Sequence, residues 1–551
     1  MPTVGSNPTP SATFSLHPDG GITLNTADRH SVIGRYLAAL RQLGDTMLTD
    51  RSLRDTLRRG RHDFWTASRT RESSLWLNQG VAEQINTVRD HYSNTASPTR
   101  DRWVFARALA AWSRSLVDSL RLRSPLELVA DVIFVQYWPT PKPGDTGDTP
   151  TGWMSPYFRE LPEALAQQGL SVGFLHLHAD GRITRAPRSV RRQVKLANLN
   201  GRRHLLLSES LSLNSLLRAL VAWLRVQVLW SLKKTERALP KDLDVERLWK
   251  RWKHTLYSSV RGSHAVRNAL LSEMFAEVVS RNPRTKVWVS AFEGQSWESC
   301  LARVLDEHGA RWLPYLHTMM RPWDLRAHTY LAEAAPEYLA LHGIHDRDEL
   351  MPTVTQASIR TGKPVTRIID VEALRYQHLL RTESELTASR NDIQRDPIWL
   401  VVGGAECKTS ETEFEAFADA VCAAKLQYKI VARWHPQCRP PDWMSHAGIA
   451  FSTEPLAVLS QRASAAIMVG LAAPLDTYLS GVPSCSFASS SGLSMSPISE
   501  NELHHVAANA HEAVKWMLEA SGKSHRVPDP NRYFYFDSNF CRWKQAIESF
   551  M

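Results

Sequence analysis

The alternation of short apolar runs with amphipathic segments is the feature that most constrains the fold of this chain. A strand, a helix and another strand are expected in succession at "KVWVSAF", "SWESCLARVLDEHG" and "ARWLPYLHT". This order is typical of βαβ units with a parallel sheet. A second series of the same kind begins at "IWLVVGGA" and runs to "VPSCSF". We therefore predict an α/β protein with two Rossmann-like, doubly wound domains that face a cleft.

Changes of pattern along the chain divide it into four segments. Apolar residues at three- and four-residue steps predict a flexible N-terminus and an Arg-rich helical extension over residues 1–124. Residues 125–385 are expected to form the first α/β domain, with a mainly helical insertion from about Ser189 to Asn282. The second α/β domain is expected at 396–520, and 521–551 is an aromatic tail that ends in a helix.

Composition favours an anionic partner without choosing one. The formal charge of +10 suits nucleic acid, an acidic membrane surface or a phosphorylated or carboxylated substrate. Basic residues alternate with acids and no nucleic-acid motif accompanies them, so we expect no specific nucleic-acid partner. The absence of Walker, GxGxxG, HExxH and GxSxG motifs disfavours NTPases, dehydrogenases, zinc proteases and α/β-hydrolases. The six isolated cysteines are expected to be reduced thiols in a cytoplasmic protein, and the N-terminus does not resemble a secretory signal.

The most apolar segment, "HLLLSESLSLNSLLRALVAWLRVQVLWSLKK", is interrupted by charges too often to span a bilayer. With Trp223, Trp230, Lys233 and Lys234 it has the composition of a helix that lies on an anionic membrane surface. A buried helix of the first domain is the favoured alternative, because Leu-rich helices usually belong to the core.

The stretch "VSAFEGQSWE" places Glu293 directly after a buried-looking strand. Ligands of parallel α/β sheets bind beyond the carboxyl ends of strands, and Gly294 lets the backbone turn there. Glu293 is therefore a candidate general base or nucleophile. The sequence leaves open the alternative that Glu293 is an N-terminal helix acid, with Ser296 and Glu298 serving the cap and the helix dipole.

Two further groups follow strands of the second series. In "ARWHPQ", Arg433 and His435 could donate hydrogen bonds to a phosphate, although a surface His-Pro turn is the alternative. After Gly470, a turn and a helix N-terminus offer backbone N–H groups to an anion, and a Ser-rich loop adds hydroxyl groups.

In "LHTMMRPWDLR", His317, Arg321 and Arg326 follow the strand after the Glu-Gly helix. Arginines at this position could hold a substrate carboxylate in a bidentate fork, whereas structural ion pairs, for instance with Asp324, are the alternative. The Asp-x-Asp strings that begin at Asp242 and Asp346 lie in charged context, and we expect neither a metal nor a cofactor.

Several of these motifs resemble the surface carbohydrate biosynthesis protein family of bacterial O-antigen loci. They are "FEGQSWE", "YLHTMMRPWDLR", "GGA", "RWHP", "GVPSCSF", "GLSMSPI" and "YFYFDSNFCRWK", and the resemblance runs from about Asp131 to the C-terminus. More distantly, the layout is similar to GT-B glycosyltransferases that use CMP-activated ulosonic acids, such as bacterial sialyltransferases and β-Kdo transferases.

Those transferases carry a D/E-D/E-G motif, an HP motif and a later Ser-containing motif. Glu293-Gly294 matches the end of the first motif, with Phe292 in place of its first acid. His435-Pro436 matches the second. The third would be matched by Ser489, Ser490 or Ser496. Ala472 and Ala473 stand where a hydroxyl residue near the phosphate is expected.

The resemblance implies a bacterial, cytoplasmic, metal-independent glycosyltransferase that moves a sugar from a nucleotide-activated donor, with a CMP-ulosonic acid as the candidate, to a growing O-antigen or lipopolysaccharide acceptor. The acceptor would be an oligosaccharide or lipid-linked glycan on the side of the first domain, at the inner face of the inner membrane. Glu293 and His317 would be catalytic. The sugar would be bound by Gly294, Arg321 and Arg326, and the nucleotide by Arg433, His435, Pro436, Gly470, Ser489, Ser490 and Ser496. The alternative is a non-catalytic assembly or scaffold protein with the same fold, which the altered acidic motif favours.

Overall fold

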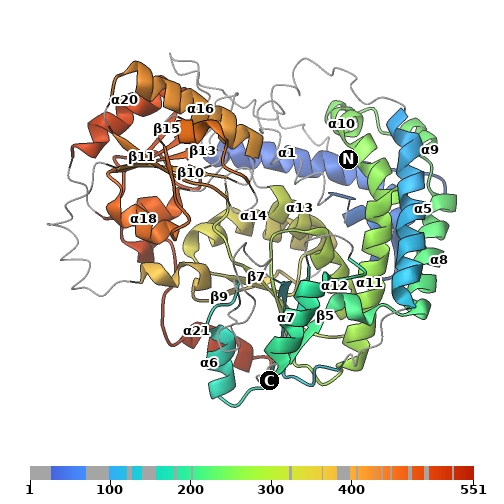
Figure 1. Ribbon diagram of the computed structural model, residues 1–551. Helices are drawn as coiled ribbons and strands as arrows, with labels where there is room; N and C mark the ends of the chain where they lie inside the picture. Colours follow the sequence, from blue (N-terminus) through green and yellow to red (C-terminus); the bar gives the residue numbers. More distant parts are fainter. Residues whose placement is uncertain are drawn as a thin grey trace, which may run out of the picture.

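The computed structural model describes most of the chain. The described residues are 26–66, 68–69, 99–120, 127–138, 155, 157–178, 183–199, 203–321, 325–362, 364–380, 398–404, 407–426, 428–435, 438–446, 449–469, 474–488, 496–523 and 527–551. Figure 1 shows a first domain at the centre and bottom of the view, a second domain at the upper left and a layer of long helices at the right.

The first domain is built on a seven-stranded, fully parallel sheet in the order β5-β4-β3-β6-β7-β8-β9. Its strands are nearly continuous apolar runs because helices cover both faces of such a sheet. The strand order reverses between β3 and β6, which is the topological switch point of a doubly wound fold. The strands are β3 (Val132–Tyr137), β4 (Val172–Leu177), β5 (Arg203–Leu206), β6 (Val287–Ala291), β7 (Trp312–Leu316), β8 (Tyr338–Leu341) and β9 (Arg367–Asp370).

The second domain repeats this plan with six parallel strands in the order β12-β11-β10-β13-β14-β15. Its switch point lies between β10 and β13. The strands are β10 (Ile398–Gly403), β11 (Lys429–Arg433), β12 (Ala450–Phe451), β13 (Ala465–Val469), β14 (Ser484–Phe487) and β15 (His504–Ala507). The prediction of two doubly wound α/β domains is thus confirmed.

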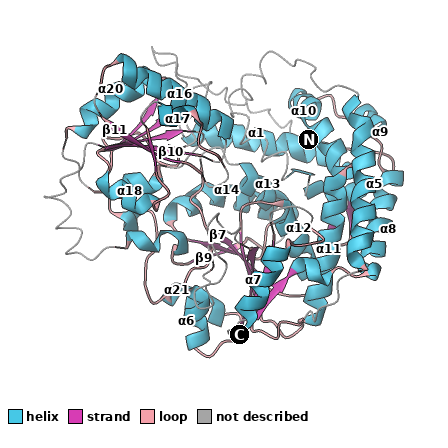
Figure 2. Cartoon of the chain, viewed as in Figure 1, coloured by secondary structure: helices cyan, strands magenta, loops and turns pink. Residues whose placement is uncertain are grey.

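Helices pack on both sheets (Figure 2). The first domain carries α6 (Leu161–Gln167), α7 (Arg188–Leu199), α12 (Ser296–Glu307), α13 (Leu325–Ala334) and α14 (Ile344–Thr361). The second carries α16 (Cys407–Ala423), α17 (Trp443–His446), α18 (Leu456–Arg462), α19 (Leu475–Leu479) and α20 (Ala510–Ser521).

The C-terminal tail returns to the first domain as α21 (Cys541–Glu548). Figure 1 places α21 near α6, at the bottom of the first domain. The backbone N–H groups of Arg542 and Trp543 donate to the carboxylate of Glu372 at 2.8 and 3.0 Å. Trp543 is buried beside strand residues of the first sheet. The first domain therefore caps the N-terminus of α21 and holds this helix in place.

A helical layer packs against the side of the first domain. It contains α1 (Thr26–Asp45), α2 (Leu53–Leu57), α5 (Thr99–Ser119), α8 (Leu213–Leu229), α9 (Leu232–Ala238), α10 (Leu243–Arg261) and α11 (Ser263–Arg281), with a small hairpin of β1 (Arg58–Arg59) and β2 (His62–Asp63). Helices from the N-terminal extension and from the insertion thus form one layer, because α5 and α1 pack on α8, α10 and α11.

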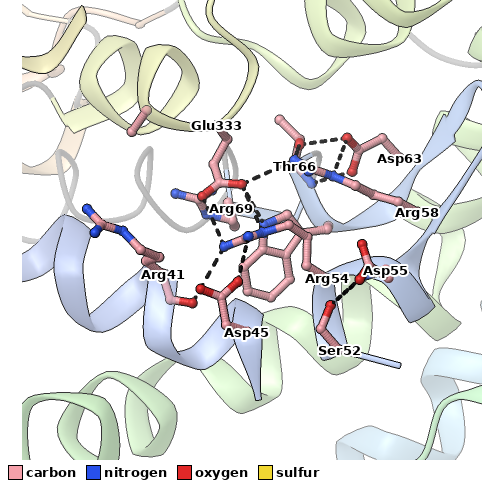
Figure 3. Close-up of polar contacts among 12 residues, drawn as sticks. Arg41, Asp45, Ser52, Arg54, Asp55, Arg58, Asp63, Thr66, Arg69 and Glu333 are labelled. Carbon is pink, nitrogen blue, oxygen red and sulfur yellow. Dashed lines mark hydrogen bonds and ion pairs between the residues drawn. The ribbon is translucent and has the colours of Figure 1, made fainter. Parts of the chain in front are cut away.

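A buried carboxylate ties this extension to the first domain (Figure 3). The side chain of Glu333 on α13 is 3% exposed and forms ion pairs with Arg54, Arg58 and Arg69 at 3.1, 3.2 and 2.9 Å. The indole N–H of Trp65 donates to the same carboxylate at 3.3 Å. Burial lowers the pKa of Arg69 to about 9, and the neighbouring Arg54 and Arg58 add to this effect. Glu333 therefore has a structural role: it links the N-terminal extension to the first domain.

An apolar cluster joins the two domains. Met319, Ala373 and Tyr376 of the first domain pack with Leu475 and Tyr478 of the second. Nε2 of His378 lies 3.2 Å from the Asp476 carboxylate at the edge of this cluster. The segment η2 (Leu374–Leu379), which leads from the first domain to the second, therefore belongs to their shared core.

Two expectations about side chains need correction. Cys407 and Cys438 form a disulfide, so the prediction that all six cysteines are reduced thiols is wrong for this pair. The two residues follow β10 and β11, neighbouring parallel strands whose carboxyl ends meet at one edge. Trp223 and Trp230, suggested for a membrane surface, are instead fully buried. Their large apolar rings fill the helical layer, as the core-helix alternative anticipated.

Candidate functional site

The carboxyl ends of β3 and β6 form the switch point of the first sheet. Tyr137 is the last residue of β3, and its hydroxyl donates to Oε1 of Gln295 in the turn after β6 at 2.8 Å. The indole N–H of Trp297 donates to the same oxygen at 3.1 Å. Since strands separate at a switch point, this is the edge where a ligand is expected to bind. The turn that carries Glu293 is fixed there by Tyr137 of β3 and Trp297 of α12.

The structure separates the two acids of "EGQSWE" by role. The carboxylate of Glu298 is buried and accepts the backbone N–H groups of Glu293 at 2.9 Å and of Gln295 at 3.1 Å. Burial raises the pKa of Glu298 well above its ordinary value, and these two donors only partly oppose that effect. Glu298 therefore closes the N-terminus of α12. Glu293 precedes the helix and does not cap it, so the capping interpretation holds for Glu298, whereas the catalytic role of Glu293 stays a prediction.

The carboxylate of Glu293 is held by two side chains. Oε1 lies 3.3 Å from Nε2 of His317, which follows β7, and the amide nitrogen of Gln295 donates to Oε2. The Glu293 side chain is 25% exposed, whereas His317 is 7% exposed. The structure thus brings together the two residues predicted to be catalytic, one partly open to solvent and one behind it.

His317 is a neutral hydrogen-bond donor in this arrangement. Burial lowers its pKa well below the ordinary histidine value, and the positive charges of Arg375, His342 and Arg326 add to the effect. A neutral imidazole that donates from Nε2 to Glu293 leaves Nδ1 as an acceptor. Within the described residues, this buried Nδ1 has no hydrogen-bond partner. The ring of Tyr157 packs edge-on against His317, with centroids 5.0 Å apart.

Gly294 is required by the backbone at this turn. Its φ is +66°, in the left-handed region, and a Cβ there would lie 2.8 Å from Cβ of Arg326 and 2.9 Å from the Arg326 carbonyl oxygen. Arg326, on the first turn of α13, therefore packs its backbone directly over the Glu-Gly turn. Arg321 follows β7 and is half-buried. Substrate binding by Gly294, Arg321 and Arg326 stays a prediction.

The position of the missing first acid is occupied by a core aromatic residue. Phe292 is fully buried, and its ring packs edge-on against Tyr330 with centroids 5.1 Å apart. Its backbone N–H donates to the carbonyl oxygen of Tyr315 at 2.7 Å. Phe292 thus continues the sheet and the core. Glu293 is the acid that this turn directs away from the core.

Arg375 is a candidate site residue that the sequence analysis did not single out. It is exposed on η2, between the two domains. The residue as a whole is exposed, but the atoms packed around its guanidinium oppose the positive charge, whereas Tyr376 and the carboxylates of Asp476 and Glu293 raise its pKa above the ordinary arginine value. Its charge in turn lowers the pKa of His317 and of His435. One cation therefore acts on candidate residues of both domains. The signal in the sequence is the position of Arg375, which comes just after the last strand of the first domain.

The predicted nucleotide-binding residues are placed as follows. His435 is half-buried after β11, and burial lowers its pKa, with Arg433 and Arg375 adding to the effect. Arg433 donates to the carbonyl oxygens of Trp434 at 2.6 Å and Glu454 at 2.9 Å. It thereby fastens the end of β11 to the segment before α18. Ser496 is buried and accepts the N–H of Ile498 at 3.1 Å. Pro436, Gly470, Ser489 and Ser490 lie outside the described residues.

The acidic strings play structural parts where their contacts are defined. Asp346 is buried, accepts the backbone N–H of Met320 at 2.7 Å and lies 3.0 Å from Nε2 of His342. Asp242 caps α10 through the N–H groups of Asp244 and Val245. Within the part of the chain that the structure describes, no group of three or more His, Cys, Asp or Glu side chains is arranged to hold a metal ion.

No family model matches the chain, and no curated protein matches its sequence. Solved structures resemble it in overall architecture. UDP-GlcNAc 2-epimerase from Methanocaldococcus jannaschii is 10% identical, with a TM-score of 0.40 over 76% of this chain and 99% of that one. Arabidopsis thaliana UGT89C1 is 12% identical, with a TM-score of 0.37 over 76% and 94%. Anabaena Alr3699/HepE, in complex with UDP and glucose, is 10% identical, with a TM-score of 0.36 over 76% and 97%.

Proposed function

We propose that the chain is a GT-B glycosyltransferase that moves a sugar from a nucleotide-activated donor to a glycan acceptor. The observation that carries this proposal is the position of Glu293. Its carboxylate lies at the switch point of the first sheet, partly open, and is held by two donors that carry no charge. Such a carboxylate can take a proton from an acceptor hydroxyl in the transition state.

The second domain would receive the nucleotide. As the bond between the sugar and the donor phosphate breaks, negative charge grows on the departing phosphate. Arg375 can place a guanidinium fork on this charge, and neutral His435 can donate a hydrogen bond to it. A donor that reached from His435 to Glu293 would thus pass Arg375, whose charge acts on both. Gln295 and His317 would hold the Glu293 carboxylate while the acceptor hydroxyl loses its proton.

The finer identity of the substrates follows the resemblance in the sequence. A CMP-ulosonic acid is the proposed donor, because its carboxylate would suit Arg321 or Arg326. The proposed acceptor is an O-antigen or lipopolysaccharide glycan on a lipid carrier, at the cytoplasmic face of a bacterial membrane. No metal is assigned a role in this reaction.

A nucleotide panel tests the proposal directly. The full chain is heated with CMP, UDP, GDP or CDP at millimolar concentration, and nucleotide release is then measured from CMP-, UDP- and GDP-sugars. Binding of one nucleotide raises the unfolding temperature by mass action. The expected result is stabilisation by one base type and release from its sugars. A panel without stabilisation or release would overturn the proposal and favour the scaffold alternative, which buried Phe292 in place of an acid supports.

A further inference from the structure

The outer face of the helical layer carries an apolar stripe. On α8, five large apolar side chains follow one another at steps of four, four, three and four residues and are all exposed: Leu213, Leu217, Val221, Leu224 and Val228. This spacing keeps them on one face of the helix. The opposite face, with Trp223 and Val226, is packed inside the layer. The exposed side of α8 therefore carries a stripe of large apolar side chains beside Asn214, Arg218 and Arg225.

The stripe continues onto α5. Phe105, Leu109 and Leu116 of α5 and Leu120, directly after this helix, are exposed and follow at steps of four, seven and four. Phe105 stacks on Trp223 of α8 with centroids 5.8 Å apart, so the two helices lie side by side. Both lie at the outer edge of the molecule (Figure 2). Val228 is 85% and Leu120 71% exposed. A continuous apolar surface of this kind marks an interaction site.

Basic residues border this surface. Exposed cations on the same three helices are Arg107 and Arg114 of α5, Arg218 and Arg225 of α8, and Lys233, Lys234 and Arg237 of α9. Of these, Arg218 pairs with Glu273 at 2.6 Å. Among the described residues of these helices, the one exposed acid is Glu236, and it pairs with Lys253 at 3.5 Å. Apolar side chains bordered by exposed cations complement a surface that is anionic outside and apolar within.

We propose that the face formed by α5, α8 and α9 docks on an anionic lipid bilayer. Leu and Val side chains enter the boundary between headgroups and acyl chains, while Arg225, Lys233 and Lys234 contact lipid phosphates. Among the described helices, none is by itself long and apolar enough to cross a membrane, although α8 and α9, bent by 48°, meet that test together. The buried Trp223 face keeps α8 attached to the protein, so the contact is with the surface of the bilayer.

This proposal does not depend on the chemistry at Glu293, and vesicle binding tests it without any sugar substrate. The full chain is sedimented with vesicles of phosphatidylglycerol and phosphatidylethanolamine, and with vesicles of phosphatidylcholine alone. We expect binding to the anionic vesicles that weakens with salt, since surface charges are screened. Equal binding to both compositions, or to neither, would overturn the proposal.

Matched variants locate the surface. Leu217→Asp with Val228→Asp should reduce the partition onto anionic vesicles at least about tenfold, because two apolar side chains are lost and two like charges face the lipid. Ile359→Asp is the control, since Ile359 is 78% exposed on α14, which does not belong to the face formed by α5, α8 and α9. It should bind as the unaltered chain does, and both proteins should keep their unfolding temperature. Unchanged binding of the double variant would overturn the proposal. So would a dimer of the unaltered chain that the double variant converts to a monomer without vesicle binding.

Discussion

Two glutamates of the first domain, Glu333 and Glu293, differ in their surroundings, and the difference separates a structural acid from the acid that we propose to react. Glu333 is 3% exposed and pairs with Arg54, Arg58 and Arg69. Glu293 is 25% exposed and is held by neutral His317 and by Gln295. If Glu333 took a proton, three ion pairs would be lost. If Glu293 took a proton, the hydrogen bonds from two uncharged donors, His317 and Gln295, would weaken. The comparison indicates that a carboxylate that exchanges a proton needs hydrogen-bond donors that hold it in position but do not stabilise its negative charge as strongly as three arginines do.

The largest effect is expected from breaking the structural acid. Glu333→Gln leaves three arginines in a buried site without their shared charge, and loss of one partner of a buried ion pair costs about 3–5 kcal/mol. The free energy of unfolding of the first domain, followed by tryptophan fluorescence in urea, should fall by this amount. The control Glu519→Gln alters an exposed acid on α20 and should change it by less than about 0.5 kcal/mol. Equal free energies of unfolding for the two variants would show that the ion pairs of Glu333 do not stabilise the fold.

The second-largest effect is expected from Arg375, the cation between the domains, and it should appear in nucleotide binding. Arg375→Ala removes a charged hydrogen-bond donor from the proposed phosphate site, and we expect the dissociation constant of the stabilising nucleotide to rise about 10- to 100-fold. Calorimetric titration of the full chain measures this. Arg367→Ala, which removes an exposed arginine from β9, is the matched control. A similar affinity in both variants would remove Arg375 from the site.

The group that positions Glu293 should have a smaller effect. Gln295→Met keeps the length of the side chain but removes the amide that donates to Glu293 and accepts from Tyr137. We expect kcat to fall about tenfold with KM changed less than about twofold, since a proton-transfer group is misplaced while substrate contacts stay. A change confined to KM would assign Gln295 to substrate binding instead.

The pH profile should show the smallest change. Burial and nearby positive charges lower the pKa of His317, so it stays neutral below the ordinary histidine value of about 6.5. Protonation would turn the donor beside Glu293 into a cation and reduce activity, so the acid limb of kcat/KM should lie below that value. Arg375→Gln removes one of these charges, which raises the pKa of His317 and moves the limb to higher pH. A limb that moves to lower pH would contradict this account.

Much of the fold follows from local pattern, and the exceptions have physical causes. The apolar runs at β3, β6, β7, β10 and β13 predict buried parallel strands. Strand β5 was missed because "HLLL" continues into a long apolar helix pattern, and β15 because Val506 is the one strongly strand-forming residue in "HHVA". Both are edge strands of their sheets, where tertiary pairing outweighs propensity.

The sequence predicted the acid and the histidine of the candidate site, Glu293 and His317, but not Arg375, the cation between the two domains. Glu293 and His317 follow adjacent strands, so topology alone brings them to one edge. Arg375 and the Cys407–Cys438 disulfide depend on how separate loops meet in space, and no local spacing encodes that. The capping role of Glu298 became clear only from its two backbone hydrogen bonds.

The central claim is that the Glu293 carboxylate acts as the general base of the reaction and contributes little to the stability of the fold. Glu293→Gln, assayed for nucleotide release or glycosyl transfer with the donor identified by the panel, tests it most directly. Since general-base catalysis contributes about 10²- to 10⁴-fold, we expect activity to fall by at least about 100-fold. The unfolding temperature and nucleotide affinity should match those of the unaltered chain. Full activity in a folded Glu293→Gln protein would contradict the account.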